Sequence, residues 1–186
     1  MRNAAGDQLN PNLSPSFARA RTLSRILALL FTIGFGLMLF ASLVCLLIPV
    51  APLVPHGHLG VGFQGIRVSL DGLSTGQLLW VLLAVEITIL PLLLLMHHTR
   101  RVFGHFAKGE IFVLPVIGHI RHAGLWLIAS FLANIAAQTM LRATGFMPPG
   151  LAEGSTWPLV IGLVTFIAAY VMEEARRIAE ENASIL

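Results

Sequence analysis

Four long apolar runs divide the sequence, at residues 26–50, 78–96, 124–141 and 157–172. Each run carries almost no charge, and each is close to the roughly 20 residues that a helix needs to cross a hydrocarbon core of about 30 Å. The pattern predicts an all-α membrane protein, a bundle of four transmembrane helices. Residues 26–50 form a longer apolar run than the h-region of a signal peptide, so we expect them to be retained as the first span.

Composition supports the same class, because 56% of the residues are hydrophobic and only 11% are charged. A soluble domain carries about 25% charged residues. With 186 residues the chain has room for one membrane domain. We expect that domain to span residues 23–186 and to include a helical tail at 173–186, after a flexible N-terminal segment at 1–22.

Basic residues lie almost entirely on one side of the alternation that the four runs create. The positive-inside rule therefore predicts that both termini and the middle loop lie in the cytoplasm. These basic groups also meet the anionic inner leaflet, so the high isoelectric point requires no nucleic acid partner. The residues on the predicted cytoplasmic side are Arg2, Arg19, Arg21, Arg25, Arg100, Arg101, Lys108, Arg121, Arg176 and Arg177, whereas Arg67 and Arg142 fall on the other side.

Short signals mark the connections between the spans. Residues 61–70 show a partial alternation of apolar and other residues, which favours a short strand or hairpin on the outer side. Ser74 or Thr75 is placed to cap the second span, and residues 155–158 read as a helix start with a capping hydroxyl and a proline in the first turn.

The loop between the second and third spans has a helical pattern of its own. Val102, Phe103 and Phe106 share one face, and Gly109 follows as a C-terminal stop. This pattern predicts an amphipathic helix lying at the cytoplasmic membrane surface. Pro115 then begins a further helix that leads into the third span.

This loop also carries a resemblance to a known family. The run at residues 103–112, Phe-Gly-His-Phe-Ala-Lys-Gly-Glu-Ile-Phe, and the later tripeptide Glu180-Glu181-Asn182 resemble the bacterial four-span membrane family catalogued as domain of unknown function 2975. The chain departs from that family at Val113-Leu114-Pro115, where Thr and acidic or amide residues are common.

The resemblance implies a bacterial inner-membrane protein with no established activity. Genes of that family often neighbour one for a small helix-turn-helix regulator, which implies a link to signalling. We therefore expect a cytoplasmic interaction surface for a regulator or another membrane protein. Its candidate residues are Arg100, Arg101, Phe103, Phe106, Lys108, Gly109, Glu180, Glu181 and Asn182.

The tail predicts a helix with three i,i+4 ion pairs, each contributing a few tenths of a kcal/mol. The pairs are Glu173 with Arg177, Arg176 with Glu180, and Arg177 with Glu181. Two interpretations remain open. The tail is either a solvated helix end, or it docks on the basic loop residues Arg100, Arg101 and Lys108.

One acidic residue, Glu86, falls within the apolar runs. A charge near the bilayer centre costs about 2.5–3.5 kcal/mol on insertion scales, so it normally faces the protein interior or a partner. Asn134 falls at a similar depth, with Gln138 one turn away, and we expect a Glu86–Asn134 hydrogen bond. The three residues form either an interhelical polar clamp or a proton- or ligand-responsive site.

Five histidines gather around the middle loop, at His97, His98, His105, His119 and His122. Their spacing is compatible with metal or haem ligation, but axial haem ligands in a bundle usually sit within facing spans. We expect solvated interfacial side chains and no cofactor.

No catalytic signature is present, since the sequence lacks Cys-x-x-Cys, Gly-x-Ser-x-Gly, His-Glu-x-x-His and a phosphate-binding glycine loop. We expect a regulatory or sensory interaction protein rather than an enzyme, embedded in the bilayer and without direct contact to nucleic acid. The alternatives are a small transporter or channel-type homo-oligomer that uses Glu86, and an accessory subunit of a larger membrane complex.

Overall fold

The fold is a set of four long antiparallel helices, each long and apolar enough to cross a membrane. The computed structural model describes residues 15–47, 60–63, 66–69, 73–146 and 155–183. The four helices are α1 (Pro15–Leu47), α2 (Thr75–Lys108), α3 (Leu114–Ala143) and α4 (Trp157–Ala183). They confirm the predicted four-span, all-helical architecture of a multi-pass membrane protein.

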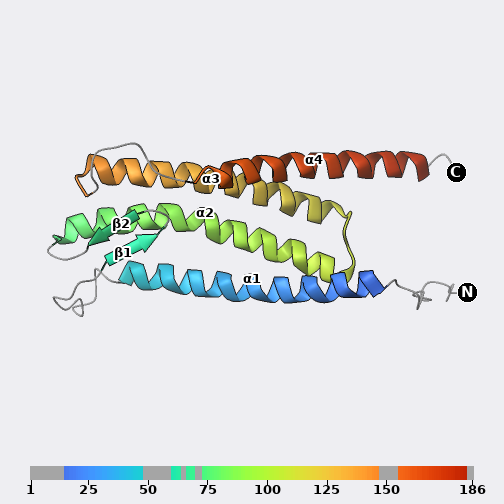
Figure 1. The fold of residues 1–186 in the computed structure, drawn as a ribbon, viewed down its shortest axis with the longest axis horizontal. Helices are drawn as coiled ribbons and strands as arrows, with labels where there is room; N and C mark the ends of the chain where they lie inside the picture. Colours follow the sequence, from blue (N-terminus) through green and yellow to red (C-terminus); the bar gives the residue numbers. More distant parts are fainter. Residues whose placement is uncertain (1–14, 48–59, 64–65, 70–72, 147–154, 184–186) are drawn as a thin grey trace, which may run out of the picture.

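Two ends of the molecule are distinguished by their connections (Figure 1). The short connection between α2 and α3 lies at what we call the loop end, where α1 also begins and α4 also ends. The opposite end, called the hairpin end, carries strands β1 (Gly60–Phe63) and β2 (Ile66–Ser69). These strands pair antiparallel, with Val61 opposite Val68, within the segment where a strand or hairpin was predicted.

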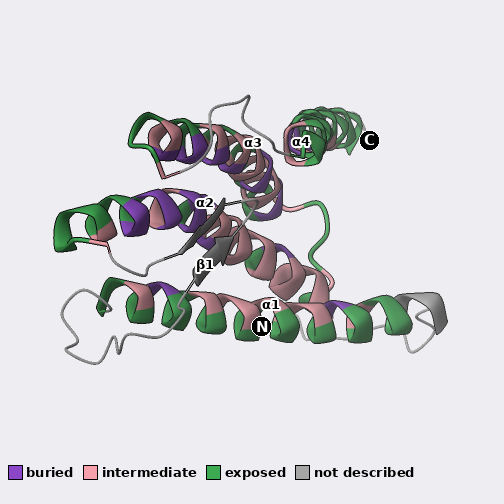
Figure 2. Ribbon diagram, turned by 60° about the vertical axis from the view of Figure 1, so that its left-hand side comes forward, coloured by how far each residue is buried: buried purple, intermediate pink, exposed green. Residues whose placement is uncertain are grey.

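The helices form an open row. In the described part of the chain, extensive helix contacts join α1 to α2, α2 to α3 and α3 to α4. Figure 2 shows α4 set apart from α1, with green exposed surface around most of α4 and along the outer side of α1. Only α2 and α3 therefore have a neighbouring helix on two sides, and the predicted bundle is open between its first and last helices.

Helix α2 runs without a break through the segment that was predicted to form a separate helix at the membrane surface. Ser74 caps its start, with its hydroxyl accepting from the backbone N–H of Gln77 while the Gln77 side chain accepts from the Ser74 backbone N–H. The helix ends at Gly109, whose φ of 86° lies in the left-handed region. Because no strong helix stop precedes Gly109 after the second apolar run, the loop segment extends α2 and the separate helix is a wrong prediction.

The other helix boundaries also extend beyond the apolar runs. Helix α1 begins at Pro15, so residues 15–22 of the predicted N-terminal segment are helical, whereas residues 1–14 lie outside the described residues. Helix α3 has its proline in the first turn, as predicted for Pro115. Helix α4 begins at Trp157, whose backbone N–H donates to the Ser155 hydroxyl at 3.3 Å, and continues through the predicted tail to Ala183.

The three helix contacts differ in their packing. Between α2 and α3 lies a buried cluster of Val81, Ala84, Ala137 and Leu141. Between α1 and α2, Phe35 and Met38 pack against the buried cluster of Val85, Ile89 and Leu93. Between α3 and α4 the backbones themselves approach, since a Cβ on Gly124 would lie 2.9 Å from the Gly162 carbonyl oxygen. Small residues at such crossings let membrane helices approach closely.

The position of this crossing displaces α4 along α3. Gly162 lies in the second turn of α4, whereas Gly124 lies far from the end of α3 that leads to α4. At about 1.5 Å per residue, the two helices are offset by roughly 20 Å toward the loop end. Figure 1 shows the result, because α4 begins beside the middle of α3 and projects past the loop end.

Candidate functional site

The loop end carries a groove between the α2–α3 connection and the last turns of α4. It has a volume of about 490 Å³ and is lined by Phe112, Ala175, Arg176, Ala179, Glu180 and Ala183. Phe112 is 62% exposed although it is large and apolar. The three alanines are spaced four residues apart, so they form one face of the helix, and their small side chains leave the groove open beside Phe112.

The connection that carries Phe112 is held by α1. The Arg21 guanidinium donates to the Lys108 carbonyl oxygen at 2.9 Å. The left-handed φ of Gly109 favours glycine, and a Cβ there would lie 2.6 Å from the Arg21 guanidinium, so a larger residue would also displace that flexible side chain. The predicted helix stop at Gly109 is confirmed, and its contact with α1 is an addition that the sequence did not indicate.

The predicted interaction residues of the α2 segment divide between internal contacts and exposed positions. Arg100 lies 4.7 Å from the centre of the Phe35 ring and donates to His97 Nδ1 at 3.1 Å. Phe103 stacks on Phe31 at 5.7 Å and meets Phe106 edge to face. Arg101 and Lys108 are exposed, as are Glu180, Glu181 and Asn182 on α4.

The tail contacts α3 and the loop through different groups from those predicted. Glu173 reaches Arg121 at 3.9 Å, and Phe112 faces the alanine side of the tail across the groove. The ion pairs Arg176–Glu180 and Arg177–Glu181 are confirmed, at 2.6 Å and 3.6 Å. The predicted Glu173–Arg177 pair is replaced by Arg177–Glu174 at 2.7 Å, because Glu173 is turned toward α3.

The five histidines named above, which we call the histidine cluster, join α2 to α3 just inside the loop end. His98 Nδ1 and His119 Nδ1 are 3.1 Å apart. The His122 ring stacks on the His98 ring at 5.0 Å, with 10° between the planes, and His122 Nδ1 donates to the Gly118 carbonyl oxygen. His97 meets His98 edge to face, and His105 lies 6.1 Å from His119.

The cluster extends to the loop through Glu110. His105 Nδ1 lies 2.6 Å from Glu110 Oε2, and this hydrogen bond is the main reason that the pKa of Glu110 is lowered from its ordinary value. Across the described ranges, no three His, Cys, Asp or Glu side chains are arranged to hold a metal ion. The cluster is therefore a set of ring contacts and hydrogen bonds between two helices.

Glu86 bridges α1 and α2. The Ser42 hydroxyl donates to Glu86 Oε2 at 2.7 Å, so the partner given by the structure is Ser42, where the sequence had suggested Asn134. The second carboxylate oxygen is buried and has no hydrogen-bond partner among the residues described. Sequence reasoning missed Ser42 because serines also occur on α1 at positions with no such role.

Asn134 and Gln138 belong to a polar ladder along α3. Gln138 donates to the Asn134 side-chain oxygen at 2.6 Å, and Arg142 donates to the Gln138 side-chain oxygen at 3.2 Å. Asn134 is 7% exposed and Gln138 is 1% exposed. The predicted polar site of Glu86, Asn134 and Gln138 is therefore split. Glu86 bonds Ser42 between α1 and α2, whereas Asn134 and Gln138 bond each other along α3.

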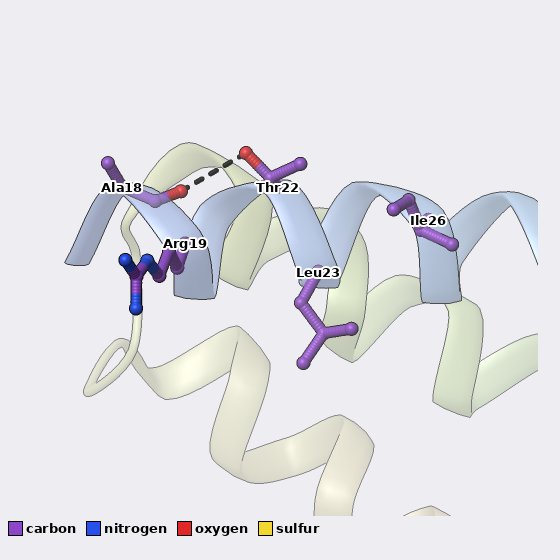
Figure 3. A pocket seen from close by; sticks show the side chains of 5 residues that line it. All are labelled: Ala18, Arg19, Thr22, Leu23 and Ile26. Carbon is purple, nitrogen blue, oxygen red and sulfur yellow. Dashed lines mark hydrogen bonds between the residues drawn. The ribbon is translucent and has the colours of Figure 1, made fainter. Parts of the chain in front are cut away.

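A second, shallower groove lies on the outer face of α1 near the loop end (Figure 3). It has a volume of about 390 Å³ and is lined by Ala18, Arg19, Thr22, Leu23 and Ile26. The Thr22 hydroxyl donates to the Ala18 carbonyl oxygen at 3.1 Å, so its polar atom is satisfied within the helix. This face combines an exposed basic residue with apolar side chains, as expected where a helix meets a lipid surface.

Comparisons with protein-family models, with curated proteins and with solved structures found no match for this chain.

Proposed function

We propose that this protein is a regulatory or sensory membrane protein that presents its loop end to a partner in the bacterial cytoplasm. The observation that carries the proposal is the groove between Phe112 and the alanine face of α4. An exposed aromatic side chain beside a small-residue helix face provides apolar contact area for a protein segment. Arg176 and Glu180 at its edge add charges of both signs.

The charge pattern supports the cytoplasmic orientation in this proposal. Most Lys and Arg residues belong to segments at the loop end, and the positive-inside rule assigns such segments to the cytoplasm. The resemblance in residues 103–112 and 180–182 falls on the same end of the molecule. A single partner is therefore able to contact both segments at once.

The test is site-specific photocrosslinking in native membranes. A photoreactive phenylalanine analogue replaces Phe112 in one variant and Glu180, at the edge of the groove, in another. The expected result is the same crosslinked protein from both positions, because both line one groove. A matched control places the analogue at Leu132, a 57% exposed residue of α3 on the apolar run, where only lipid should react.

Specificity is tested by filling the groove. The substitution Ala175→Trp should abolish the crosslink from Glu180 without changing expression. Crosslinks to lipid alone from Phe112, or an identical product from Leu132, would contradict the proposal.

A second candidate function is a channel-type or accessory membrane assembly that uses Glu86. Its supporting observation is the buried, unpartnered carboxylate oxygen of Glu86 beside α1, the helix with the most exposed apolar surface. A self-crosslink from analogues on the exposed face of α1, with no groove product, would favour this alternative.

A further inference from the structure

The histidine cluster is built on a contact that depends on the protonation of imidazole. A 3.1 Å separation between His98 Nδ1 and His119 Nδ1 is a hydrogen bond only if one of the two nitrogens carries a proton and the other accepts it. If both rings become imidazolium, both nitrogens carry hydrogens and both rings are positive. The contact between α2 and α3 then changes from attractive to repulsive.

The surroundings of this pair favour the neutral state. His98 faces His97 on its own helix and His119 and His122 on α3. His119 also faces His105 and Arg101 of α2. Every group in these two sets is a base, so each added proton enters a neighbourhood of the same sign.

Acidic groups and other charges touch only the edges of the cluster. Glu110 in the loop bonds His105, and Glu173 of α4 reaches Arg121, which lies between His119 and His122 in sequence. From α1, Phe35 contacts His97 and Arg100, and Arg21 bonds the Lys108 carbonyl oxygen. Within the described residues, no carboxylate is recorded in contact with the His98–His119 pair.

We propose that the histidine cluster is a proton-responsive contact that regulates the shape of the loop-end groove. Protonation of both His98 and His119 on acidification separates α2 from α3 at this level. Two contacts transmit the displacement toward the groove. One is the His105–Glu110 bond, two residues from Phe112, and the other is the Arg121–Glu173 pair, which joins α3 to α4. This regulation rests on the proposed function of the groove.

The pH range of the response is set by imidazole. The bond to His105 lowers the pKa of Glu110 in the folded protein. The contribution of Glu110 to the stability of the fold is therefore present above the ordinary carboxyl pKa, and it is lost only as the pH falls through the lower, folded value. Glu110 therefore stays ionised between pH 7.5 and 5. Glu110 is therefore not the source of a structural change in that range. Burial, followed by the charges of His122, His119 and His97, lowers the pKa of His98 to about 4, so the paired protonation requires stronger acidification.

Two measurements on the full chain in lipid nanodiscs test the inference without a partner. NMR of ring-labelled histidines follows the titration of His98 from pH 7.5 down to about pH 3.5, a range that includes its lowered pKa of about 4. Hydrogen exchange, corrected for the pH dependence of the intrinsic rate, follows residues 109–113. We expect His98 to remain neutral to below about pH 6.5, and exchange at 109–113 to rise severalfold as it titrates.

The variant His119→Gln removes one titrating ring but keeps a side chain that hydrogen-bonds. The His98 midpoint should rise by roughly half a pH unit or more, because a neighbouring like charge is lost, and the pH response at 109–113 should disappear. Thr139→Gln, an exposed position on α3 away from the cluster, is the control and should retain the native response. If His119→Gln is unstable at pH 7.5, His119→Asn replaces it.

The inference is overturned if His98 titrates identically in the native protein and the His119 variant, or if exchange at 109–113 does not change with pH. This outcome is independent of the groove test, which depends on a partner and does not vary the pH. If no protein is crosslinked at the groove but His98 still titrates differently in the His119 variant, only the proposed function is refuted.

Discussion

Helix α3 contacts its two neighbours in opposite ways. Toward α2 it presents a broad surface of buried side chains, including Ala137, Leu141 and the ladder residue Gln138. Toward α4 it presents Gly124, with no side chain at the closest approach. Only Gly162 and Ala169 of α4 are buried, so the contact with α4 is concentrated on a few small residues.

This difference shows that apolar helices in a membrane acquire specific neighbours through local contacts and not through apolarity. Lipid is as apolar as leucine, so apolarity alone cannot select one helix face over another. The most apolar 18-residue windows of α1 and α2 are similar in hydropathy, but 6% of the window is buried in α1 and 44% in α2. Side-chain packing, close backbone approach and polar bonds, rather than hydropathy, therefore decide which helix faces meet.

The strongest way to break the α3–α4 contact is the substitution Gly124→Ala. Its Cβ would meet the Gly162 carbonyl oxygen and the Phe166 backbone nitrogen, both at 2.9 Å, and backbone atoms cannot move aside as a flexible side chain can. We expect a loss of about 1–3 kcal/mol, measured by unfolding in SDS titrations from mixed micelles.

The control is Gly118→Ala on the same helix, where an added Cβ meets nothing within 4 Å. It should be neutral or stabilising by up to about 1 kcal/mol, because alanine is the better helix former. Equal losses from the two variants would mean that the Gly124 crossing is not a specific contact.

The α2–α3 side should show a smaller, distributed effect. Asn134→Leu removes the oxygen that accepts from Gln138, leaving a buried amide with one bond fewer. Polar bonds between and along membrane helices are worth about 1 kcal/mol, so we expect a loss of that size in the same unfolding assay. Thr139→Val is the control, since its exposed hydroxyl bonds only its own helix, and a loss as large as that of Asn134→Leu would refute the comparison.

The smallest effect is expected at the edge of the α3–α4 contact. Arg121→Gln removes an exposed 3.9 Å ion pair and should cost only a few tenths of a kcal/mol. It should nevertheless slow disulfide formation between cysteines placed at Phe112 and Ala179 in a chain lacking Cys45. Arg177→Gln, whose ion pairs lie within α4, should leave that rate unchanged, and a similar slowing would assign the effect to the tail helix instead.

Local signals made several features of the fold predictable. Ser74 with Gln77, Pro115 and Gly109 each act on the backbone within one turn, so their effects do not depend on what the helix packs against. The paired charges Arg176 and Glu180 were predictable for the same reason. The prediction of a separate helix in the loop segment was wrong, because amphipathic spacing indicates that a segment is helical but does not indicate where that helix begins.

The candidate site depended on contacts between distant residues. Ser42 and Glu86, His98 and His119, and Arg121 and Glu173 each come from two helices, and their meeting depends on helix rotation and offset. A shift of one residue turns a helix face by about 100°. The depth of the two residues along their spans predicted that Asn134 lies near Glu86. The rotation of α2 instead turns Glu86 toward Ser42 on α1.

Sequence alone determined that this chain has four helices long and apolar enough to cross a membrane, where three of them begin, and which charged segments share one end. It did so because hydropathy, capping and charge act locally or sum along the chain. Only the tertiary structure decided that the row is open, that α4 is displaced toward the loop end, and that Phe112 faces the alanines of α4. These features follow from a backbone contact between two glycines, whose position along each helix no periodicity reveals.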